Sequence, residues 1–419
     1  MAASMAFQSA GDRFMGNQGG SGAMSDAVAE TFTKELCRMR GAALKVGQIL
    51  SLQDSQNLPP SLAKALEKVR TEANVMPKWQ LREVLEKELG ENWETKFKEF
   101  DMEPFAAASI GQVHQAVALD GRKIAVKIQY PGVADSVDAD MANLQRLLQL
   151  GQFIPKGLFL DRVINTAKEE LAYECDYIRE AENQSRFADL LKKFGHTPNS
   201  KLNIPEILPD ISTSRILSSE WVDGEPVDRL VSDGVSQKLR DSVADRMLSW
   251  VIKEVFQFRL VQSDPNWSNF LYDEETDTLN LIDFGATNEY SKEFIDKYLR
   301  LVWACAEKDR VKILRTSKEI GFLGGKESPA MISAHIEAAY VMGEPFAADN
   351  QPFDFSTFKH SERMAKQGQV FLKERLVPPP KEVYTLHRKL FGAISTCVKL
   401  KAKVDCRERL EEALKNPLK

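Results

Sequence analysis

The hydrophobic pattern of this chain switches from a helical period to a strand period and back, which restricts the folds open to it. From Asp26 to Gln53, apolar residues recur at spacings of three and four, as on one face of an amphipathic helix. Further helices are expected from Pro60 and over residues 77–89. The segments VHQAVAL and RKIAVKIQ then alternate or run apolar around the turn signal DGR, which predicts a β-hairpin.

After this hairpin the pattern is mostly helical again, with two short interruptions. Helices are predicted near residues 135–150, 161–190 and 236–258, and mainly helices beyond residue 290. The interruptions are a strand in SRILSSEWV and a hairpin of NFLY and LNLIDF around the turn DEETDT. Helices, a small sheet and more helices together indicate an α+β protein with two unequal lobes.

Composition and charge exclude several classes of protein. The 419-residue chain has a net charge of −5 and no basic arm, which argues against general nucleic-acid binding. Its five cysteines are scattered without a CxxC pair, as expected for buried thiols in a reducing compartment. No apolar run is long enough to cross a bilayer. Residues 1–25 are rich in Gly, Ser, Ala and Met and are expected to be disordered, without the pattern of a transit or signal peptide.

The stretch SDPNWSNFLYDEETDTLNLIDFG carries the most informative chemistry. Asp264 and Asn269 form a D-x4-N motif, and Asp283 opens a DFG triplet after a hairpin. Phosphoryl transfer needs an aspartate beside the nucleophile and hard oxygen ligands for Mg²⁺, and protein kinases place these residues in the same order. We therefore predict Asp264 as the catalytic aspartate, and Asn269 and Asp283 as metal ligands. Gln262 and Ser263 stand where kinases usually have His-Arg, so the support of the aspartate must be built differently.

A lysine on the first hairpin and the segment after the next strand are candidate nucleotide contacts. The strand KIAVKIQ places Lys127 beside Ala125 on one face, as in the VAIK strand whose lysine holds the α- and β-phosphates. The segment EWVD follows the next apolar strand and occupies the place of a hinge between lobes, where backbone groups would meet adenine. Its residues are Glu220, Trp221, Val222 and Asp223.

Alanines occupy the place where a glycine-rich phosphate loop would precede the hairpin. The segment is PFAAASIGQVH, in which only Gly111 keeps the backbone freedom of glycine. We expect altered nucleotide handling rather than loss of binding. The residues predicted to face the phosphates are Ala106, Ala107, Ala108 and Ser109.

Acidic residues in EELAYECDYIREAENQ are candidate partners for a buried cation. Glu174 falls on the expected apolar stripe of the 161–190 helix, which continues to Ile178, and a buried carboxylate there needs a cation. The candidate cations are Lys45 and Lys127.

Asp176 and Glu180 lie four residues apart and are expected to share another face of the same helix. A kinase-like site needs one glutamate to orient Lys127. Glu180 is favoured for that role, and Glu174 comes second.

The N-terminal helix contains an unexpected glycine in LKVGQILSLQ. A glycine inside a helix costs about 1 kcal/mol relative to alanine, so Gly47 needs a reason. Gly41, Lys45 and Gln48 share a face beside the apolar stripe, and Lys45 is a candidate partner of Glu174. We interpret Lys45, Gly47 and Gln48 as a regulatory plug on the active site, with Gly47 allowing the helix backbone to approach the kinase-like lobe closely.

These motifs together resemble the UbiB family of atypical kinase-like proteins, also called aarF-domain-containing kinases. The matching segments are KVGQ, AAAS, ECD, DPNWSN and DFG, and the resemblance covers nearly the whole chain from about residue 26. SIGQVHQA, IAVKIQYPGV and LIDFGAT look most similar to the mitochondrial branch required for coenzyme Q biosynthesis. The chain departs from the commoner bacterial DPHPGN at Asn266, Trp267 and Ser268, so a different loop shape is expected.

The resemblance implies a two-lobed protein-kinase-like fold with an N-terminal helical extension packed over the cleft. It implies that Lys45 and Gln48 belong to an inhibitory KxGQ segment at the protein-substrate site, and that Glu174 and Asp176 form an ExD pair. It also implies ATP or ADP with Mg²⁺ as cofactors, a mitochondrial location, and coenzyme Q biosynthetic enzymes and lipid intermediates as partners. Peripheral membrane contact fits such a pathway, although the amphipathic segment LHRKLFGAISTCVKLKAKV is expected to face the core.

The expected domains are a disordered start, an N-terminal helical extension with the KxGQ motif, a kinase-like N-lobe with a helical insertion, and a mostly helical C-lobe. Their ranges are 1–25, 26–92, 93–222 and 223–419. The expected function is a Mg²⁺-dependent ATPase or atypical kinase that supports coenzyme Q biosynthesis. The alternatives are a kinase for a small molecule or lipid, and a nucleotide-sensing scaffold that organises biosynthetic enzymes.

Overall fold

The structure of the chain is a computed structural model, and most of the chain is described in it. The disordered start expected for residues 1–25 and most of the helix expected from Pro60 lie outside the described residues. The description covers residues 33–54, 66, 68–69, 75–150, 159–194, 201–232, 234–264 and 266–415.

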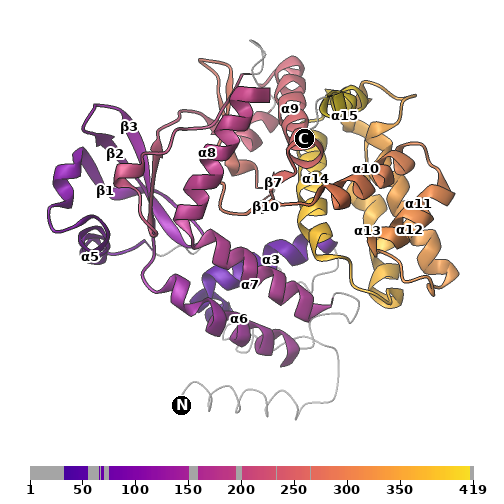
Figure 1. The fold of residues 1–419 in the computed structure, drawn as a ribbon, viewed down its shortest axis with the longest axis horizontal. Coiled ribbons are helices and arrows are strands. Elements are labelled where there is room, and N and C mark those ends of the chain that lie inside the picture. The colour runs from indigo at the N-terminus through magenta and orange to yellow at the C-terminus, as the bar shows by residue number, and fades with distance from the viewer. Residues whose placement is uncertain are drawn as a thin grey trace.

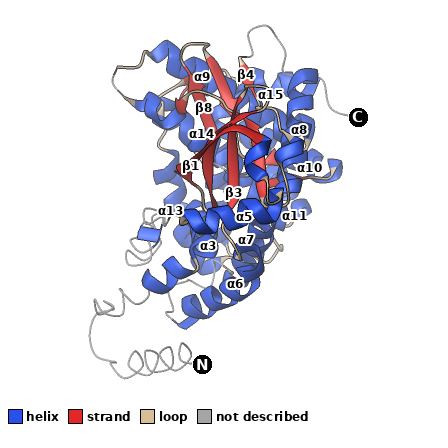
Figure 2. Cartoon of the chain, turned by 90° about the vertical axis from the view of Figure 1, so that its left-hand side faces the viewer, coloured by secondary structure: helices blue, strands red, loops and turns tan. Residues whose placement is uncertain are grey.

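An antiparallel sheet of four strands forms the smaller lobe, on the left of Figure 1, and Figure 2 labels its strands β1 and β3. The predicted hairpin is confirmed, because strand β2 pairs with β3 in register across the DGR turn. Strand β1, which was not predicted, precedes this hairpin and includes the first alanines of the expected phosphate loop. In order across the sheet, the strands are β1 (Phe97–Ala107), β2 (Gly111–Ala118), β3 (Lys123–Gln129) and β5 (Ile216–Glu220).

Alternation along β3 determines which side chains reach the site. Ile124, Val126 and Ile128 are fully buried in a core shared with helix α5 (Lys78–Leu89) and with η1 (Trp93–Lys96). Since successive side chains of a strand point to opposite faces, Lys127 points away from this core.

Three helices form a second layer at the bottom of Figure 1, where α3, α6 and α7 lie side by side. Their buried apolar side chains, with Ile110 and Leu217 from the sheet region, make one core cluster. The stripe expected for the N-terminal helix is buried at Leu36, Met39, Ala43 and Val46. The bounds are Arg40–Asp54 for α3, Val133–Leu150 for α6 and Leu160–Glu174 for α7.

The single helix expected over residues 161–190 is wrong, because the chain breaks at Cys175 and Asp176. Helix α7 ends at Glu174 and α8 (Tyr177–Phe194) begins after the break, with the Asp176 carboxylate accepting a hydrogen bond from the Arg179 amide. The apolar stripe therefore does not continue as expected, and Ile178 is 53% exposed. Glu174 and Glu180 consequently sit on two different helices.

The larger lobe is mainly helical, and its described residues contain three small sheets. The helix expected over 236–258 is α-helical only as α9 (Gln237–Ile252) and continues as a π-helical turn, η5 (Lys253–Phe258). The predicted hairpin of NFLY and LNLIDF is confirmed as β8 and β9. The strands of the first two sheets are β4 (Leu202–Asn203), β6 (Glu225–Pro226), β7 (Leu260–Gln262), β8 (Phe270–Asp273), β9 (Thr278–Leu281) and β10 (Thr287–Glu289).

The helices expected beyond residue 290 are present and lie on the right of Figure 1. Helix α14 packs against α9, and its apolar stripe is buried in the main core, as predicted for the amphipathic segment. A short pair of strands, β11 (Phe353–Asp354) and β12 (Lys403–Val404), was not predicted. The helices are α10 (Lys292–Ala306), α11 (Arg310–Ile320), α12 (Pro329–Gly343), α13 (His360–Glu374), α14 (Lys381–Lys399) and α15 (Cys406–Lys415).

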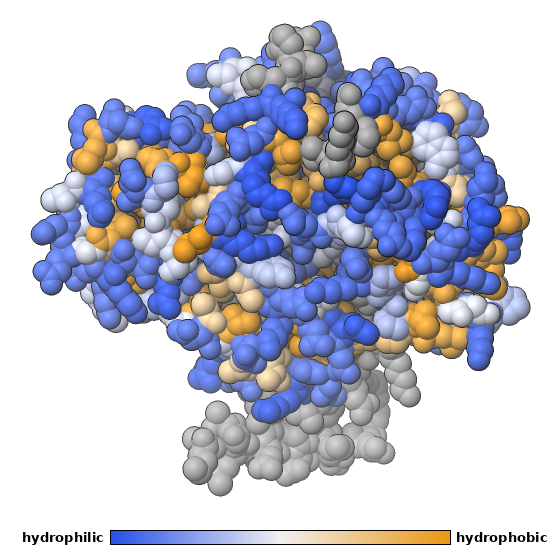
Figure 3. Space-filling model, viewed as in Figure 1, coloured by the Kyte–Doolittle hydropathy of each residue, from blue (hydrophilic) through white to orange (hydrophobic). Residues whose placement is uncertain are grey.

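The predicted α+β class with two unequal lobes is confirmed by this arrangement. On the face drawn in Figure 3, apolar side chains are interspersed among hydrophilic ones. Among the described helices, none is long and apolar enough to cross a membrane. The domain boundaries at residues 92 and 222 stay predictions.

Candidate functional site

Lys127 of β3 lies between two carboxylates from different parts of the chain. Its Nζ donates to both carboxylate oxygens of Glu180 on α8, at 2.9 and 3.0 Å, and lies 3.7 Å from Asp283 Oδ2. Of the two glutamates considered from the sequence, Glu180 is thus the one that contacts Lys127. The ammonium group also lies 5.1 Å from the centre of the Tyr177 ring.

The charges around Lys127 are not balanced, because one lysine faces two carboxylates. Burial alone would lower the pKa of Lys127, but Asp283 and Glu180 hold it well above its ordinary value. Burial raises the pKa of Glu180 to about 7, against the attraction of Lys127. The Asp283 carboxylate is therefore only partly compensated by Lys127, which favours a further cation beside it.

The DFG segment is fixed tightly against α8. Asp283 has a φ of 66°, in the left-handed region that non-glycine residues rarely adopt. A Cβ on Gly285 would lie 3.2 Å from Glu180 Oε2, which leaves little room for a side chain there. The Arg179 guanidinium donates hydrogen bonds to the carbonyls of Gly285 and Thr287.

Asp264 and Asn269 meet as their spacing predicts. The Asn269 side-chain amide donates a 2.9 Å hydrogen bond to Asp264 Oδ2, and the Ile282 amide donates to the Asn269 carbonyl at 3.0 Å. The second bond places Asn269 directly beside the strand that leads to Asp283.

The side-chain oxygens of Asn269 and Asp283 are suitable ligands for Mg²⁺. With its NH₂ group bonded to Asp264, Asn269 has an amide oxygen left as a ligand, and Asp283 offers a partly exposed carboxylate. Mg²⁺ is usually bound by one or two such groups together with substrate phosphates and water. Within the described part of the chain, no cluster of three or more His, Cys, Asp or Glu residues could hold a metal by itself.

The departure from the bacterial loop changes the surroundings of Asp264. The Asn266 side-chain oxygen accepts a hydrogen bond from the Ser268 backbone amide at the start of η6 (Trp267–Asn269), and the Asn266 backbone amide donates to Asp264 Oδ1 at 3.3 Å. The Lys399 ammonium lies 4.3 Å from the centre of the Trp267 ring, so the end of α14 lies against this loop.

Two basic residues of α14, which the sequence analysis missed, contact the residues that stand where kinases usually have His-Arg. Arg388 Nε donates to the Ser263 carbonyl at 2.9 Å, immediately before the predicted catalytic aspartate. Lys389 donates to the Gln262 side-chain oxygen at 3.2 Å. A signal was present, since Lys389 lies three residues after buried Leu386 and four before buried Ala393, on the apolar stripe of the helix.

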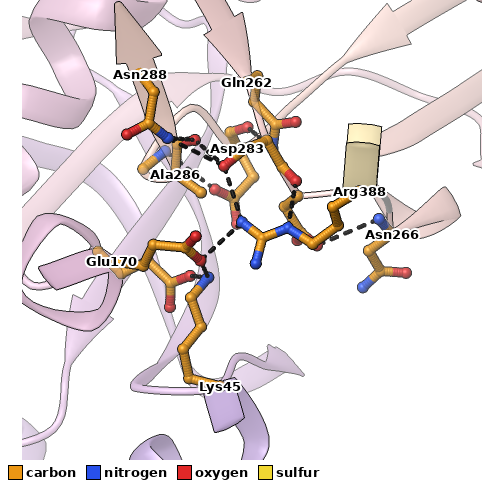
Figure 4. A network of polar contacts seen from close by, with 12 residues as sticks. Lys45, Glu170, Gln262, Asn266, Asp283, Ala286, Asn288 and Arg388 are labelled. Atoms are coloured by element: carbon orange, nitrogen blue, oxygen red, sulfur yellow. Dashed lines mark hydrogen bonds and ion pairs between the residues drawn. The ribbon is translucent and has the colours of Figure 1, made fainter. Parts of the chain in front are cut away.

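Lys45 of α3 and Arg388 meet at Glu170, another residue that the sequence analysis missed. Glu170 Oε2 lies 2.9 Å from Lys45 Nζ and 2.7 Å from an Arg388 nitrogen, and Lys45 also contacts Glu174 at 2.6 Å. Figure 4 shows Lys45 and Arg388 pointing toward Glu170 from different elements. The expected contact between Lys45 and Glu174 is therefore present, within a larger buried network that reaches Ser263.

The charges of this network reinforce one another. Burial would lower the pKa of Lys45, but Glu170 and Glu174 raise it above its ordinary value. Burial would raise the pKa of Glu170, but Lys45 and Arg388 hold it below its usual range. For Glu174, burial prevails over Lys45 and the pKa is raised.

The reason that we gave for Gly47 from sequence is wrong. A Cβ on Gly47 would lie 3.1 Å from two methyl carbons of Leu66, in the N-terminal helical part of the chain itself. The glycine that faces the lobe is Gly41, whose added Cβ would lie 3.3 Å from Ile110. The side chain of Gln48 lies outside what the structure describes.

The alanine segment and the hinge lie against each other. Ala106 and Ala107 are exposed at the end of β1, Ala108 and Ser109 are half-buried after it, and the Ala108 amide donates to the Gly111 carbonyl. The preceding Phe105 ring packs edge-on against Trp221, with centroids 4.9 Å apart.

The hinge segment itself is anchored by backbone hydrogen bonds. The Glu220 amide donates to the Glu206 carbonyl, and the Trp221 amide donates to the Lys123 carbonyl. Val222 is half-buried, and the Asp223 carbonyl accepts from Asn280. Asp176 is exposed at the break before α8 and caps that helix through the Arg179 amide.

Gly111 is not a site of backbone freedom, contrary to the sequence analysis. It does not have a positive φ, but an added Cβ would lie 2.4 Å from the Ile128 carbonyl oxygen of the neighbouring strand. A glycine is required here because two backbones approach closely.

We expect Gly111→Ala to lower the free energy of unfolding by about 1–3 kcal/mol, since the clash is with a backbone atom that cannot rotate away. Urea unfolding measures the change. Gly234→Ala is the matched control, because a Cβ there has no neighbour within 4 Å. Equal stability of the two variants would contradict this explanation.

Comparisons with known proteins agree on one type of domain. Residues 68–317 match the family model described as the ABC1 atypical kinase-like domain. The chain is 42% identical over 396 residues to "Atypical kinase COQ8B, mitochondrial" of Rattus norvegicus, covering 94% of this chain and 74% of that protein. It is 43% identical over 387 residues to "Atypical kinase coq-8, mitochondrial" of Caenorhabditis elegans, covering 91% of this chain but only 50% of the relative.

A solved structure has the same fold. The complex of Rv3197 with erythromycin from Mycobacterium tuberculosis superposes with a TM-score of 0.61 at 25% identity. The match covers 93% of this chain and 95% of that one, so the likeness extends over both lobes.

Proposed function

This chain belongs to the ABC1 atypical kinase-like family, and on that premise we propose that it is a Mg²⁺-dependent ATPase or atypical kinase that acts in coenzyme Q biosynthesis. The family resemblance inferred from the motifs is thereby confirmed. The mitochondrial location and the role in coenzyme Q biosynthesis expected from the sequence agree with the names of the relatives, which are mitochondrial atypical kinases of the COQ8 group.

One observation carries the proposal. Lys127 contacts Glu180 and lies beside Asp283. The pair of Asp264 and Asn269 reaches the same place, because Asn269 accepts a hydrogen bond from Ile282, the residue before Asp283. Phosphoryl transfer requires these groups together, because a cation holds the phosphates, two oxygen ligands hold Mg²⁺ and an aspartate faces the nucleophile.

The residues have distinct roles in this proposal. Lys127 binds the α- and β-phosphates and Glu180 orients it, while Asn269 and Asp283 hold Mg²⁺, which neutralises charge on the transferred phosphate. Asp264 orients or deprotonates the nucleophile. Residues 106–109 close over the phosphates, and the backbone of residues 220–223 binds adenine.

The alanine segment favours selective nucleotide handling rather than fast turnover. Because Gly111 is fixed against β3 and Phe105 packs on Trp221, the segment between them has limited freedom to close over phosphates. Measuring ATP and ADP affinities of Ala106→Gly against the parent tests this part of the proposal.

We also propose that α3 covers the place where a protein substrate would dock. Its buried Lys45 is held by Glu170 and Glu174, which lie next to the residues around Asp264 and the DFG segment. In this proposal Glu174 holds Lys45 of the plug and does not contact the nucleotide. Asp176, which is exposed before α8, remains available to a metal or a phosphate.

Transfer to a small acceptor is the second candidate, favoured by the retention of Asp264 in a partly exposed position beside Asn269. A hydroxyl group of a lipid intermediate would then replace water as the nucleophile. Incubation of quinone precursors with labelled ATP and mass spectrometry of the products would detect the transfer. Label released only as inorganic phosphate would argue for the ATPase alone.

We expect Asp283→Asn to lower Mg²⁺-dependent ATP hydrolysis by about 100-fold or more, because it removes a charged metal ligand at the point where charge develops. The measurement is phosphate release at saturating ATP and Mg²⁺. Asp273→Asn is the control, because Asp273 is a half-buried aspartate at the end of β8 whose carboxylate bonds only within the following turn. Equal turnover in parent and Asp283→Asn would refute the catalytic assignment.

A further inference from the structure

Gln262 connects the strand before the catalytic aspartate to the DFG segment. It is buried at the end of β7, and its side-chain NH₂ group donates a 3.1 Å hydrogen bond to the carbonyl of Asp283. Gln262 and Asp283 lie next to each other in Figure 4. The bond thus reaches the backbone of the proposed metal ligand without occupying its carboxylate.

The direction of the Gln262 amide is determined by Lys389. A lysine ammonium can only donate hydrogen bonds, so the group that faces it must be the amide oxygen. Lys389 Nζ lies 3.2 Å from Gln262 Oε1, and the NH₂ group therefore points to Asp283. Lys389 thus prevents the amide from turning its oxygen toward the Asp283 carbonyl, where two acceptors would repel.

Glu254 completes the arrangement from the π-helical turn η5. Its Oε2 lies 3.2 Å from Lys389 Nζ and accepts a hydrogen bond from the Gln262 backbone amide, also at 3.2 Å. Glu254, Lys389 and Gln262 are all at most 4% exposed. Buried charges of this kind are costly unless paired, and π-helical turns occur frequently at functional sites.

The Asp283 backbone needs such support. Its φ of 66° belongs to a conformation that costs of order 1–3 kcal/mol for a residue other than glycine, and it persists only where surrounding contacts hold it. The Gln262 bond is made to the carbonyl of this same residue.

We propose that Gln262, oriented by the buried pair of Lys389 and Glu254, is a positioning residue that holds the Asp283 backbone in its left-handed conformation and so aims the carboxylate at the metal. The inference rests on the proposed Mg²⁺ site. It gives one task to three buried residues from η5, β7 and α14.

The test compares Gln262→Met with Gln262→His. Methionine has a similar length but no donor, whereas a neutral imidazole has one acceptor for Lys389 and one N–H for the Asp283 carbonyl. We expect Gln262→Met to raise the Mg²⁺ concentration for half-maximal ATP binding by about 10–100-fold, the range for loss of an outer-shell contact. Gln262→His should restore the Mg²⁺ dependence of the parent. The readout is calorimetric ATP binding over a series of Mg²⁺ concentrations, with metal-free ATP binding unchanged.

Gln184→Met is the matched control, because Gln184 is another buried glutamine that donates to a backbone carbonyl, that of Pro205. It should lose comparable stability without any change in Mg²⁺ dependence. If Gln262→Met does not fold, the double variant Glu254→Gln with Lys389→Met removes both charges together and should raise the Mg²⁺ requirement in the same way.

The outcomes separate this inference from the proposed function. If the parent shows no Mg²⁺-dependent ATP binding, the proposed function fails. If the parent responds to Mg²⁺ and Asp283→Asn does not, but Gln262→Met behaves like the parent, the inference alone is overturned. A Gln262→His variant that is as impaired as Gln262→Met would overturn it as well.

Discussion

Arg388→Met is expected to lower the free energy of unfolding by about 3–5 kcal/mol, the range for breaking a buried ion pair by removing one partner. Arg388 is buried and contacts Glu170 at 2.7 Å, the Ser263 carbonyl at 2.9 Å and Ser263 Oγ at 3.0 Å. Its loss leaves a buried carboxylate with one cation fewer and a backbone carbonyl without its donor. Urea unfolding of parent and variant measures the difference.

A double-mutant cycle with Glu170→Met identifies the interaction responsible. In Glu170→Met, Lys45 still has Glu174 as its partner, and Ser263 still accepts from Arg388. If the cost of Arg388→Met comes mainly from the buried charge of Glu170 that loses a cation, the double variant should recover at least about 1 kcal/mol relative to the sum of the singles. Strict additivity would assign the whole cost to the Ser263 contacts and contradict the ion-pair explanation.

The contacts that sequence reasoning found are those fixed by short-range geometry. Asp264 and Asn269 meet because a few residues of loop connect them, and Lys127 points into the site because alternation along β3 leaves it no other face. The hairpins on both sides were predicted from alternation and turn residues. In each case the constraint operates within about ten residues of chain, where periodicity is informative.

Partner assignment over long separations was beyond the sequence alone. Glu174 and Glu180 were placed on one helix because the periodicity continues through ECDY, whereas the chain breaks there after Glu174. Because of that break, Glu174 contacts Lys45 and Glu180 contacts Lys127. The residues at the break include neither Gly nor Pro, so the pattern carried no signal that a helix ends there.

The contacts that hold Gln262 and Ser263 were missed for a related reason. The missing His-Arg pair indicated that something else must hold Gln262 and Ser263, but the residues that do so lie about 125 positions later on α14. Charged residues on the apolar stripe of α14 and inside the apolar run of η5 were the available signals. Such signals show that a buried cation or carboxylate needs a partner without showing which one.

Lys45→Met is expected to lower the free energy of unfolding by about 3 kcal/mol near neutral pH, because Glu174 loses its cation and Glu170 keeps only Arg388. The loss should also depend on pH. Burial already raises the pKa of Glu174 against the opposing effect of Lys45, so the substitution raises it further. A carboxyl group whose pKa is raised by folding destabilises the folded state as the pH increases above the pKa that the group has in the unfolded chain, about 4.3 for glutamate.

The difference in stability between parent and Lys45→Met should therefore be largest at pH 8 and decrease toward pH 5, as Glu174 takes up a proton and no longer needs a cation. Urea unfolding at both values measures this, with Lys34→Met as the control for an exposed lysine on the preceding helical segment. Adding Glu174→Gln to Lys45→Met should remove most of the pH dependence, since the titrating group is gone. A deficit that stays constant with pH, or one that survives Glu174→Gln unchanged, would mean that α3 is held by its apolar contacts and that Lys45 does not anchor the proposed plug.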